Sequence, residues 1–400
     1  MSPKLRKILS VGIYVGFLAL FVEIALQAFY YVTAGAFLFQ RVSPAIYAPN
    51  PHSGVFNRAN LELVQDTHEF SATYHTNSQG LRVAAPGREY TLQKPNGSYR
   101  IMLLGPSFAY GWGVDYENSF AALLARRLEA GEFADGAHVE VINAGVPSLP
   151  PAPHLRWYRE VGRGYAPDLV IQFIYGSMLV GNDPVPDASV DERGHLVPRN
   201  LTWAQRTRTR AKEFATVFYA WVLWTKFDAM IDNRDEEPGS TVLGAGRELV
   251  SASVFDPDRD DVREALEFYE DLQKSVAEGG SDLLVVYFPL SYAVHPEDTS
   301  RWRHLGVRDV PSQIAFDAAF ADHLRSIGVP TQNITSALRS AADTGQRLYY
   351  WLDIHWTATG NEVAARAVAE HLLAAGPPPR RSATSASELE VDEGSLGERP

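Results

Sequence analysis

The sequence contains no cysteine and no excess of positive charge. Without cysteine, disulfide bonds, thiolate catalysis and cysteine-ligated metal sites are all excluded. The formal net charge of -12 argues against a nucleic-acid partner, which would require a basic face. The chain shows no internal repeat, and no glycine-rich phosphate loop follows any predicted strand. We therefore expect no nucleic acid, no cofactor and no metal.

Three histidines in the N-terminal quarter are the candidates for a metal site. His52, His68 and His75 lie within 24 residues, and Asp66 and Glu69 sit beside His68. The set matches no metal-ligand spacing. Solvated loop histidines are the favoured interpretation, and a metal site is the alternative.

A long apolar run follows a basic N-terminus. Lys4, Arg6 and Lys7 precede apolar residues that extend from 8 to about 39. About 20 apolar residues are enough to span a bilayer, and a basic flank stays on the cytoplasmic side. Residues 1–39 are therefore predicted to be a cytoplasmic flank and a single-pass membrane anchor. The main domain would then be extracytoplasmic, either periplasmic or extracellular.

A cleaved signal peptide is the main alternative for this run. Its apolar region would be shorter and would end in a small-residue cleavage site, whereas here the apolar character continues past Phe29, Tyr30 and Tyr31. Glu23 and Gln27 interrupt the run. A carboxylate at that depth is costly, so Glu23 either marks a helix–helix contact or is tolerated within one helix.

The rest of the chain divides into three predicted parts. Residues 40–99 have little regular periodicity and form a juxtamembrane lead-in. Residues 100–376 form an α/β domain with an insertion at about 184–255, and 377–400 form a disordered tail. Near-continuous apolar strands that alternate with helices imply a parallel sheet covered on both faces. The strands are expected at 101–105, 139–143, 168–175, 282–289 and 331–334, and the helices at 119–129, 154–162, 263–277, 312–327 and 358–375.

The insertion contains an unusually aromatic block at 214–231. One interpretation is a helix that packs on the core. Another is a lid or a membrane-facing helix beside the active site. A third is a docking site for another membrane protein.

Two short segments carry the chemistry. Ser107 ends an apolar run in a Gly-Pro-Ser turn, and Asp353 and His355 precede the last predicted helix. Strand-to-helix turns of a parallel sheet meet at its carboxyl edge, where such folds bind ligands. A serine is a weak nucleophile until an imidazole takes its proton, and the imidazole needs a carboxylate to orient it. Each signal alone is weak, since an Asp-x-His also occurs by chance or in a metal site.

An oxyanion in such a site needs hydrogen-bond donors. Gly145 follows the second predicted strand and could present its backbone N–H, and a side-chain amide could add a second donor. In this order along the chain, the serine, the glycine and the Asp-x-His form a far more specific set than any member alone.

With these motifs the chain resembles the SGNH/GDSL hydrolase superfamily over roughly residues 76–375. The resemblance is carried by the segments 77–82, 105–114, 141–145 and 353–356. It implies a flavodoxin-like three-layer α/β/α sandwich with a parallel sheet, preceded by one transmembrane helix. It also implies that Ser107 is the nucleophile, His355 the general base and Asp353 its orienting acid. The N–H groups of Ser107 and Gly145 would form part of the oxyanion hole.

Two departures from the family pattern concern the turns. Pro106 stands where the family usually has Asp, but it removes only its own N–H. The family's amide donor is an Asn soon after the third strand. Asn182 matches the usual Gly-Asn-Asp string but lies about five residues late, and Ser177 is the rival in register with the strand end.

The sequence therefore predicts a membrane-anchored serine esterase or O-acyltransferase that acts on an acylated carbohydrate or lipid. The Asp-x-His-Trp pattern beside an anchor is similar to exported SGNH-like proteins that acetylate polysaccharides. The alternative is a non-catalytic SGNH-like envelope protein that serves binding or assembly.

Overall fold

The computed structural model describes most of the chain. Two stretches lie largely outside the described residues: most of the predicted insertion at 184–255, and the predicted tail beyond residue 377. The described residues are 2–34, 37–38, 45–67, 69–176, 188–198, 255–299, 309–351 and 353–377, together with single positions and short runs between 203 and 248.

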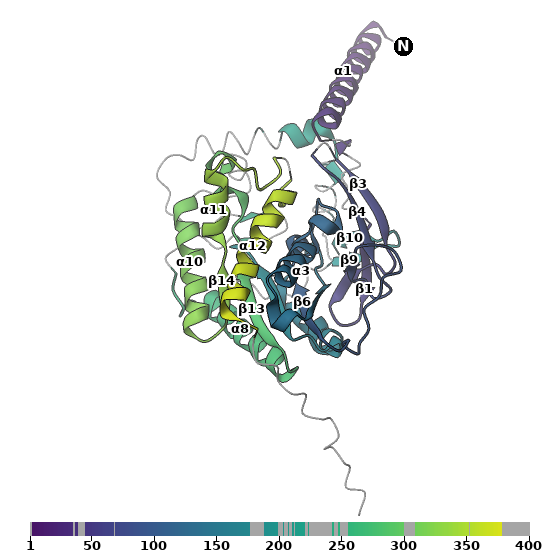
Figure 1. Ribbon diagram of the computed structural model, residues 1–400. Helices are drawn as coiled ribbons and strands as arrows, with labels where there is room; N and C mark the ends of the chain where they lie inside the picture. Colours follow the sequence, from purple (N-terminus) through teal and green to yellow (C-terminus); the bar gives the residue numbers. More distant parts are fainter. Residues whose placement is uncertain are drawn as a thin grey trace, which may run out of the picture.

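A parallel sheet of five strands forms the centre of the domain (Figure 1). Strands β6 and β8 are wholly buried and β13 nearly so, because helices cover both faces, whereas β7 begins with an exposed residue and the short edge strand β14 is half-buried. The spatial order is β14-β13-β8-β6-β7, which is the 2-1-3-4-5 order of flavodoxin-like folds. The strands are β6 (Ser98–Leu104), β7 (His138–Asn143), β8 (Leu169–Ile174), β13 (Asp282–Tyr287) and β14 (Thr331–Asn333).

Helices form the two outer layers. One face of the sheet shares a hydrophobic core with α5 (Pro151–Glu160), α8 (Asp260–Glu278) and α10 (Val310–Ser326). The other face packs against α3 (Phe120–Ala130), α11 (Thr335–Asp343) and α12 (Ala358–Ala375). The predicted three-layer sandwich is therefore confirmed.

Helix ends follow local capping chemistry. The Ser119 side chain caps α3 by accepting from Ala122 N, and the Thr357 side chain caps α12 by accepting from Gly360 N. Sequence analysis placed five of these six helices and all five strands close to their observed bounds, but missed α11.

The N-terminal region differs from expectation. Little regular structure was predicted between 40 and 99, yet three of its strands extend the central sheet in antiparallel fashion, in the order β7-β5-β4-β3. These strands are short, and in β4 polar residues alternate with Ala72 and Tyr74, a half-buried pattern that gives no long apolar run. The strands of this region are β1 (Tyr47–Asn50), β2 (Gly54–Asn57), β3 (Glu62–Asp66), β4 (Ser71–Thr76) and β5 (Arg82–Val83).

Smaller elements complete the described chain. Two hairpins lie in the predicted insertion, one formed by β9 and β10 and the other by β11 and β12. The α4 segment contains left-handed backbone at Ala134 and Asp135. The remaining bounds are α2 (Ser107–Tyr110), α4 (Phe133–Gly136), β9 (Ala188–Val190), β10 (Leu196–Pro198), β11 (Val242–Leu243) and β12 (Arg247–Glu248).

Helix α1 (Pro3–Ala34) projects from one end of the domain (Figure 1). Within it, Pro3–Val32 is long and apolar enough to cross a membrane, and its most apolar stretch is not buried against the rest of the chain. A signal sequence can also satisfy these limits of length and apolar composition. The helix therefore fits the predicted anchor without distinguishing it from its alternative.

Candidate active site

Ser107 begins the short helix α2 directly after the central strand β6. The turn requires glycine at position 105, because its φ is +146° and a Cβ there would lie 2.7 Å from the Cβ of Phe173. Pro106 occupies the N-cap position, and its carbonyl accepts a hydrogen bond from Tyr110 N at 3.1 Å. Proline is thus compatible with this turn, and Ser107 is left half-buried at the carboxyl edge of the sheet.

The loop before α12 brings His355 to Ser107. The two atoms concerned, His355 Nε2 and Ser107 Oγ, lie 2.5 Å apart. On its other side, His355 Nδ1 is hydrogen-bonded to Asp353 Oδ1, and the same oxygen accepts from His355 N at 2.9 Å. The three residues singled out in the sequence therefore form one continuous chain of hydrogen bonds.

The charge of Asp353 is favoured by its surroundings. Burial by itself raises the pKa of this carboxyl. The positive charge of His355, its hydrogen bonds and a hydrogen bond from the Trp112 side chain outweigh the burial and bring the pKa below its ordinary value. An ionised Asp353 is the form that orients an imidazole and stabilises an imidazolium.

Aromatic rings surround the imidazole. The ring of Phe108 lies 4.9 Å from that of His355, and Trp112 lies 5.7 Å away. Trp356, next to the histidine, is buried and packs edge-on against Phe108 at 5.0 Å. These contacts limit the rotation of His355 and keep water from part of its surface.

Arg82 fixes the nucleophile loop, which we define as residues 105–114. The guanidinium is fully buried and lies over the rings of Tyr74 and Tyr110 at 4.7 and 4.8 Å. It donates to the carbonyls of Tyr110 (2.8 Å), Gly111 (2.6 Å) and Val114 (2.7 Å). Arg82 comes from the predicted lead-in, and sequence analysis did not give it this role.

Glu69 fixes the acid–base loop, which we define as residues 349–356. Its two carboxylate oxygens accept from Trp351 N at 2.5 Å and from Asp353 N at 2.7 Å. A contact between the loops is made by Tyr350, whose hydroxyl donates to Gly113 O at 2.8 Å. Sequence analysis considered Glu69 only as a neighbour of His68.

Gly145 lies beside α2 but its N–H is already engaged. It donates to Asn143 Oδ1 at 3.0 Å, while Asn143 Nδ2 donates to Ala109 O at 2.8 Å. A Cβ at position 145 would lie 2.4 Å from Tyr110 N, so close packing requires glycine here. The other two candidate oxyanion donors, Asn182 and Ser177, lie outside the described residues.

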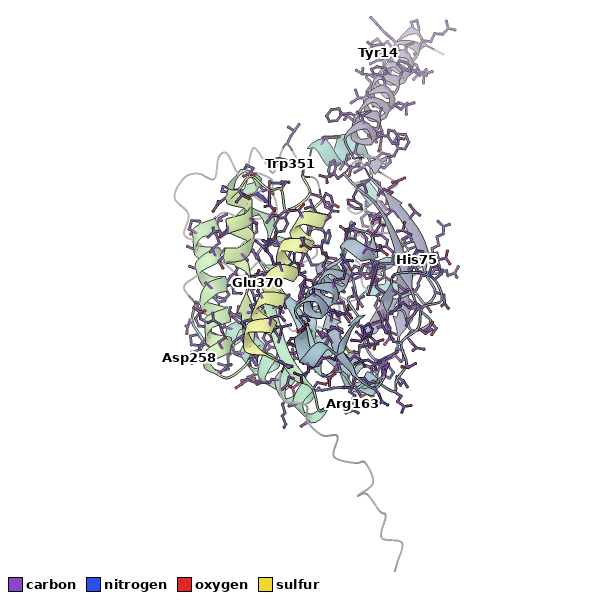
Figure 2. The ribbon with its side chains drawn as sticks, in the orientation of Figure 1. Tyr14, His75, Arg163, Asp258, Trp351 and Glu370 are labelled. Carbon is purple, nitrogen blue, oxygen red and sulfur yellow. The ribbon has the colours of Figure 1, made fainter. Side chains whose placement is uncertain are left out.

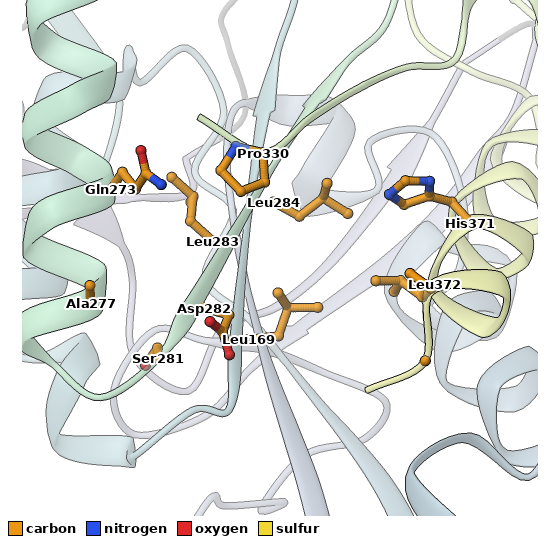
Figure 3. A pocket seen from close by; sticks show the side chains of 12 residues that line it. Leu169, Gln273, Ala277, Ser281, Asp282, Leu283, Leu284, Pro330, His371 and Leu372 are labelled. Carbon is orange, nitrogen blue, oxygen red and sulfur yellow. The ribbon is translucent and has the colours of Figure 1, made fainter. Parts of the chain in front are cut away.

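Within the described residues, neither a metal site nor the cavity that the structure shows lies at Ser107, His355 and Asp353. His68 lies outside the described residues, and the part of the chain that is described contains no cluster of three or more His, Asp or Glu side chains that could hold a metal. A cavity of about 260 Å³ opens at the opposite edge of the sheet, at the amino ends of β8 and β13 (Figure 3). Leu169, Asp282 and His371 are among its lining residues.

Comparison with known proteins supports the fold family. Residues 249–399 match the family model of the SGNH hydrolase-like domain, acetyltransferase AlgX. The resemblance to SGNH hydrolases is confirmed. The match includes Asp353 and His355 of the SGNH-like site but begins after Ser107 and Gly145. No curated protein matches the chain.

Solved structures similar to this chain are hydrolases of low identity. A lipase/acylhydrolase from Enterococcus faecalis is 16% identical with a TM-score of 0.34, covering 70% of this chain and 99% of its own. An inhibitor-bound aryl esterase from M. smegmatis is 14% identical with a TM-score of 0.37, covering 69% and 99%. A two-domain esterase active on acetylated mannans is 12% identical with a TM-score of 0.36, covering 71% and 52%.

Proposed function

We propose that the protein is a membrane-anchored, extracytoplasmic serine esterase or O-acyltransferase that acts on an acylated glycan or lipid. The observation that carries this proposal is the hydrogen-bonded chain from Ser107 through His355 to Asp353. The AlgX-type family match, described as an acetyltransferase, supports the same reaction class.

The reaction would proceed in two halves through Ser107. In the first, Oγ attacks the acyl carbon of an ester while His355 Nε2 takes the hydroxyl proton, and the imidazolium then gives that proton to the departing alcohol. In the second, His355 takes a proton from water or from a sugar hydroxyl, whose oxygen attacks the acyl carbon, and the imidazolium returns that proton to Ser107 Oγ as the acyl–enzyme bond breaks. Asp353 holds Nδ1 and stabilises the imidazolium in both halves.

The oxyanion donors remain proposals. The Ser107 N–H lies at the start of α2. From there it would donate a hydrogen bond to the oxyanion that forms when Ser107 Oγ attacks. Gly145 would serve only if its N–H turned from Asn143 toward the substrate, and Asn182 or Ser177 would supply a side-chain donor.

The engaged N–H of Gly145 specifically favours the alternative function, a non-catalytic SGNH-like envelope protein for binding or assembly. A site without this donor would lose transition-state stabilisation worth about 3 kcal/mol. The two functions therefore differ in a measurable rate.

An assay of the full chain in detergent with p-nitrophenyl acetate tests the proposal. The parent is expected to hydrolyse the ester, and Ser107→Ala is expected to lose that activity. Ser326→Ala, an exposed serine at the end of α10, is the matched control and should retain it. Equal rates for the parent and Ser107→Ala would contradict the catalytic assignment.

A second arm separates an esterase from an acyltransferase. Adding an unacylated oligosaccharide at increasing concentration should transfer acyl groups to it if a glycan is the natural acceptor. Release of free acetate alone, unchanged by the oligosaccharide, would identify a hydrolase.

A further inference from the structure

Helix α1 is joined to a distant segment of the chain through Glu23. Its Oε1 accepts from Ala215 N at 2.7 Å, and Oε2 accepts from Thr216 N at 2.9 Å and from Thr216 Oγ1 at 2.8 Å. These donors belong to the first residues of a helical segment at 215–220. In Figure 1 a short teal helix lies at the base of α1. The carboxylate thus serves a contact within one chain.

Gln27, one turn further along α1, completes the contact. Its Nε2 donates to Glu23 Oε1 and to Glu213 O, both at 2.9 Å, and its Oε1 accepts from Leu38 N at 3.0 Å. The Gln27 side chain is buried, although the most apolar part of α1 is fully exposed. Both polar residues that interrupt the apolar run therefore have partners that make them compatible with an apolar environment.

Aromatic pairs continue the contact toward the domain. Phe29 packs against Tyr219 at 5.9 Å, and Tyr30 packs edge-on against Phe218 at 5.7 Å. The same segment exposes apolar surface, with Phe214 57% and Val217 41% accessible. Aromatic rings of this kind concentrate at the boundary between hydrocarbon and headgroups.

The length of α1 sets the depth of this contact. Glu23 lies 16 positions after Lys7, a rise of about 24 Å in an α-helix, and the hydrocarbon core is about 30 Å thick. With the basic flank at the inner boundary, Glu23 lies just inside the outer boundary. Tyr30 then lies about 35 Å from Lys7, at headgroup level.

We propose that residues 214–220 form an interfacial segment, fixed by Glu23, that lies at the outer boundary between hydrocarbon and headgroups of the bilayer crossed by α1. This inference rests on the membrane anchoring in the proposed function. We assign lipid as the occupant of the exposed face of Phe214 and Val217, because hydrogen bonds and ring contacts hold this segment beside α1, whose apolar residues Ile24 and Phe29 are also exposed.

The segment would also orient the domain. Trp351, in the acid–base loop, lies at the end of the domain from which α1 projects, whereas Arg163 lies at the opposite end (Figure 2). Fixing 214–220 at the membrane therefore turns the end that carries the acid–base loop toward lipid. A substrate held at the membrane surface is then the one within reach.

Single cysteine labels test this arrangement in the full chain, because the native sequence has no cysteine. Val217→Cys, Val15→Cys and Arg163→Cys, each carrying an environment-sensitive fluorophore, are reconstituted into vesicles of zwitterionic lipid with nitroxide-bearing lipids. We expect labels at 217 and 15 to lose most of their fluorescence and the label at 163 to be unaffected.

The outcomes separate this inference from the anchoring on which it rests. Quenching at position 15 without quenching at 217 would overturn the interfacial segment and leave the anchor intact. A lack of quenching at 15 would overturn both. Neither result depends on Ser107, whose activity is assayed separately.

A second variant tests the role of Glu23. In the Val217→Cys background, Glu23→Ala should reduce quenching at 217 because the two backbone N–H groups lose their acceptor. Ile24→Ala, a change at the exposed neighbour on α1, is the matched control and should leave quenching unchanged. Undiminished quenching in Glu23→Ala would contradict the fixing role of this carboxylate.

Discussion

The nucleophile loop and the acid–base loop are held by side chains of opposite charge. Arg82 binds the carbonyls of the nucleophile loop from a fully buried position. Glu69 binds the N–H groups of the acid–base loop, where Trp351 is 59% exposed. The loop that carries Ser107 is thus embedded in the core, whereas the loop that carries His355 lies nearer the surface.

The difference between the two loops shows how each of them is held in position. Arg82 and Glu69, which we call the two clamps, belong to the N-terminal region from β3 to β5. This region extends the sheet next to β7. A buried cation whose carbonyl partners have no contact with water is costly to remove, whereas the half-buried Glu69 carboxylate costs less to remove. We therefore expect changes at Arg82 to affect folding and changes at Glu69 to affect mainly catalysis.

The largest expected effect is that of Asp353→Asn, which acts within the acid–base loop. The amide keeps the shape but loses the charge that stabilises the imidazolium, so kcat should fall about 10³-fold or more. Ester hydrolysis by the variant measures this, with Asp343→Asn, at the exposed end of α11, as the control. A loss below tenfold would mean that the carboxylate only positions the loop.

Arg82→Met tests the nucleophile loop. Removal of the guanidinium leaves three buried carbonyls without their donor, at a cost of about 3 kcal/mol or more in the free energy of unfolding. Urea denaturation of the variant should show this loss, while the exposed Arg88→Met should match the parent. If Arg82→Met were as stable as the parent, the guanidinium would not be what stabilises the nucleophile loop.

Asp317→Asn changes a buried carboxyl outside both loops. Burial raises the pKa of Asp317 to about 6, although Tyr287 and Gln313 donate hydrogen bonds to it. The folded protein therefore favours the protonated form, and this contribution to stability is present below about pH 4 and is lost as the pH rises to about 6. The loss amounts to about 3 kcal/mol.

The measurement for Asp317 is the free energy of unfolding at pH 4 and pH 7. Relative to the parent, Asp317→Asn should gain about 3 kcal/mol between the two values, with hydrolysis per folded molecule unchanged. A parallel pH dependence in both proteins would show that Asp317 is not the titrating group. This variant separates stability from catalysis.

Glu69→Gln has the smallest expected effect. One amide oxygen can still accept one of the two N–H groups, so we expect a loss of about 1 kcal/mol, or about fivefold in kcat. Glu62→Gln, exposed on β3, should have no effect. If Glu69→Gln instead lost stability as Arg82→Met does, the two clamps would be equivalent.

The three hydrogen-bonded residues of the site could be singled out from the sequence. Ser107, Asp353 and His355 sit on turns that the strand–helix alternation places at one edge of the sheet. The position of that edge could be predicted because buried strands such as β6 and β8 stand out as apolar runs in the sequence.

The supporting residues could not be found in the same way. Arg82 contacts carbonyls about 30 positions away, and Glu69 contacts N–H groups more than 280 positions away. Local pattern carries no information about such pairs. The one available signal was a charged residue between Leu81 and Val83, which marks Arg82 as buried with a polar partner.

Similar reasoning applies to Glu23 and the aromatic block. A carboxylate in an apolar helix indicates that it has a polar partner. The partners of Glu23 are Ala215 and Thr216, which lie 192 and 193 positions away. Sequence alone left the core, the membrane and another protein as alternatives for this block.

Covalent labelling of Ser107 tests the central claim most directly. The full chain is treated with a fluorophosphonate, and the modified peptide is identified by mass spectrometry. We expect one phosphonate on Ser107 in the parent and almost none in His355→Ala, because the imidazole activates the hydroxyl. A folded parent that remains unlabelled at Ser107 would contradict it and favour the non-catalytic function.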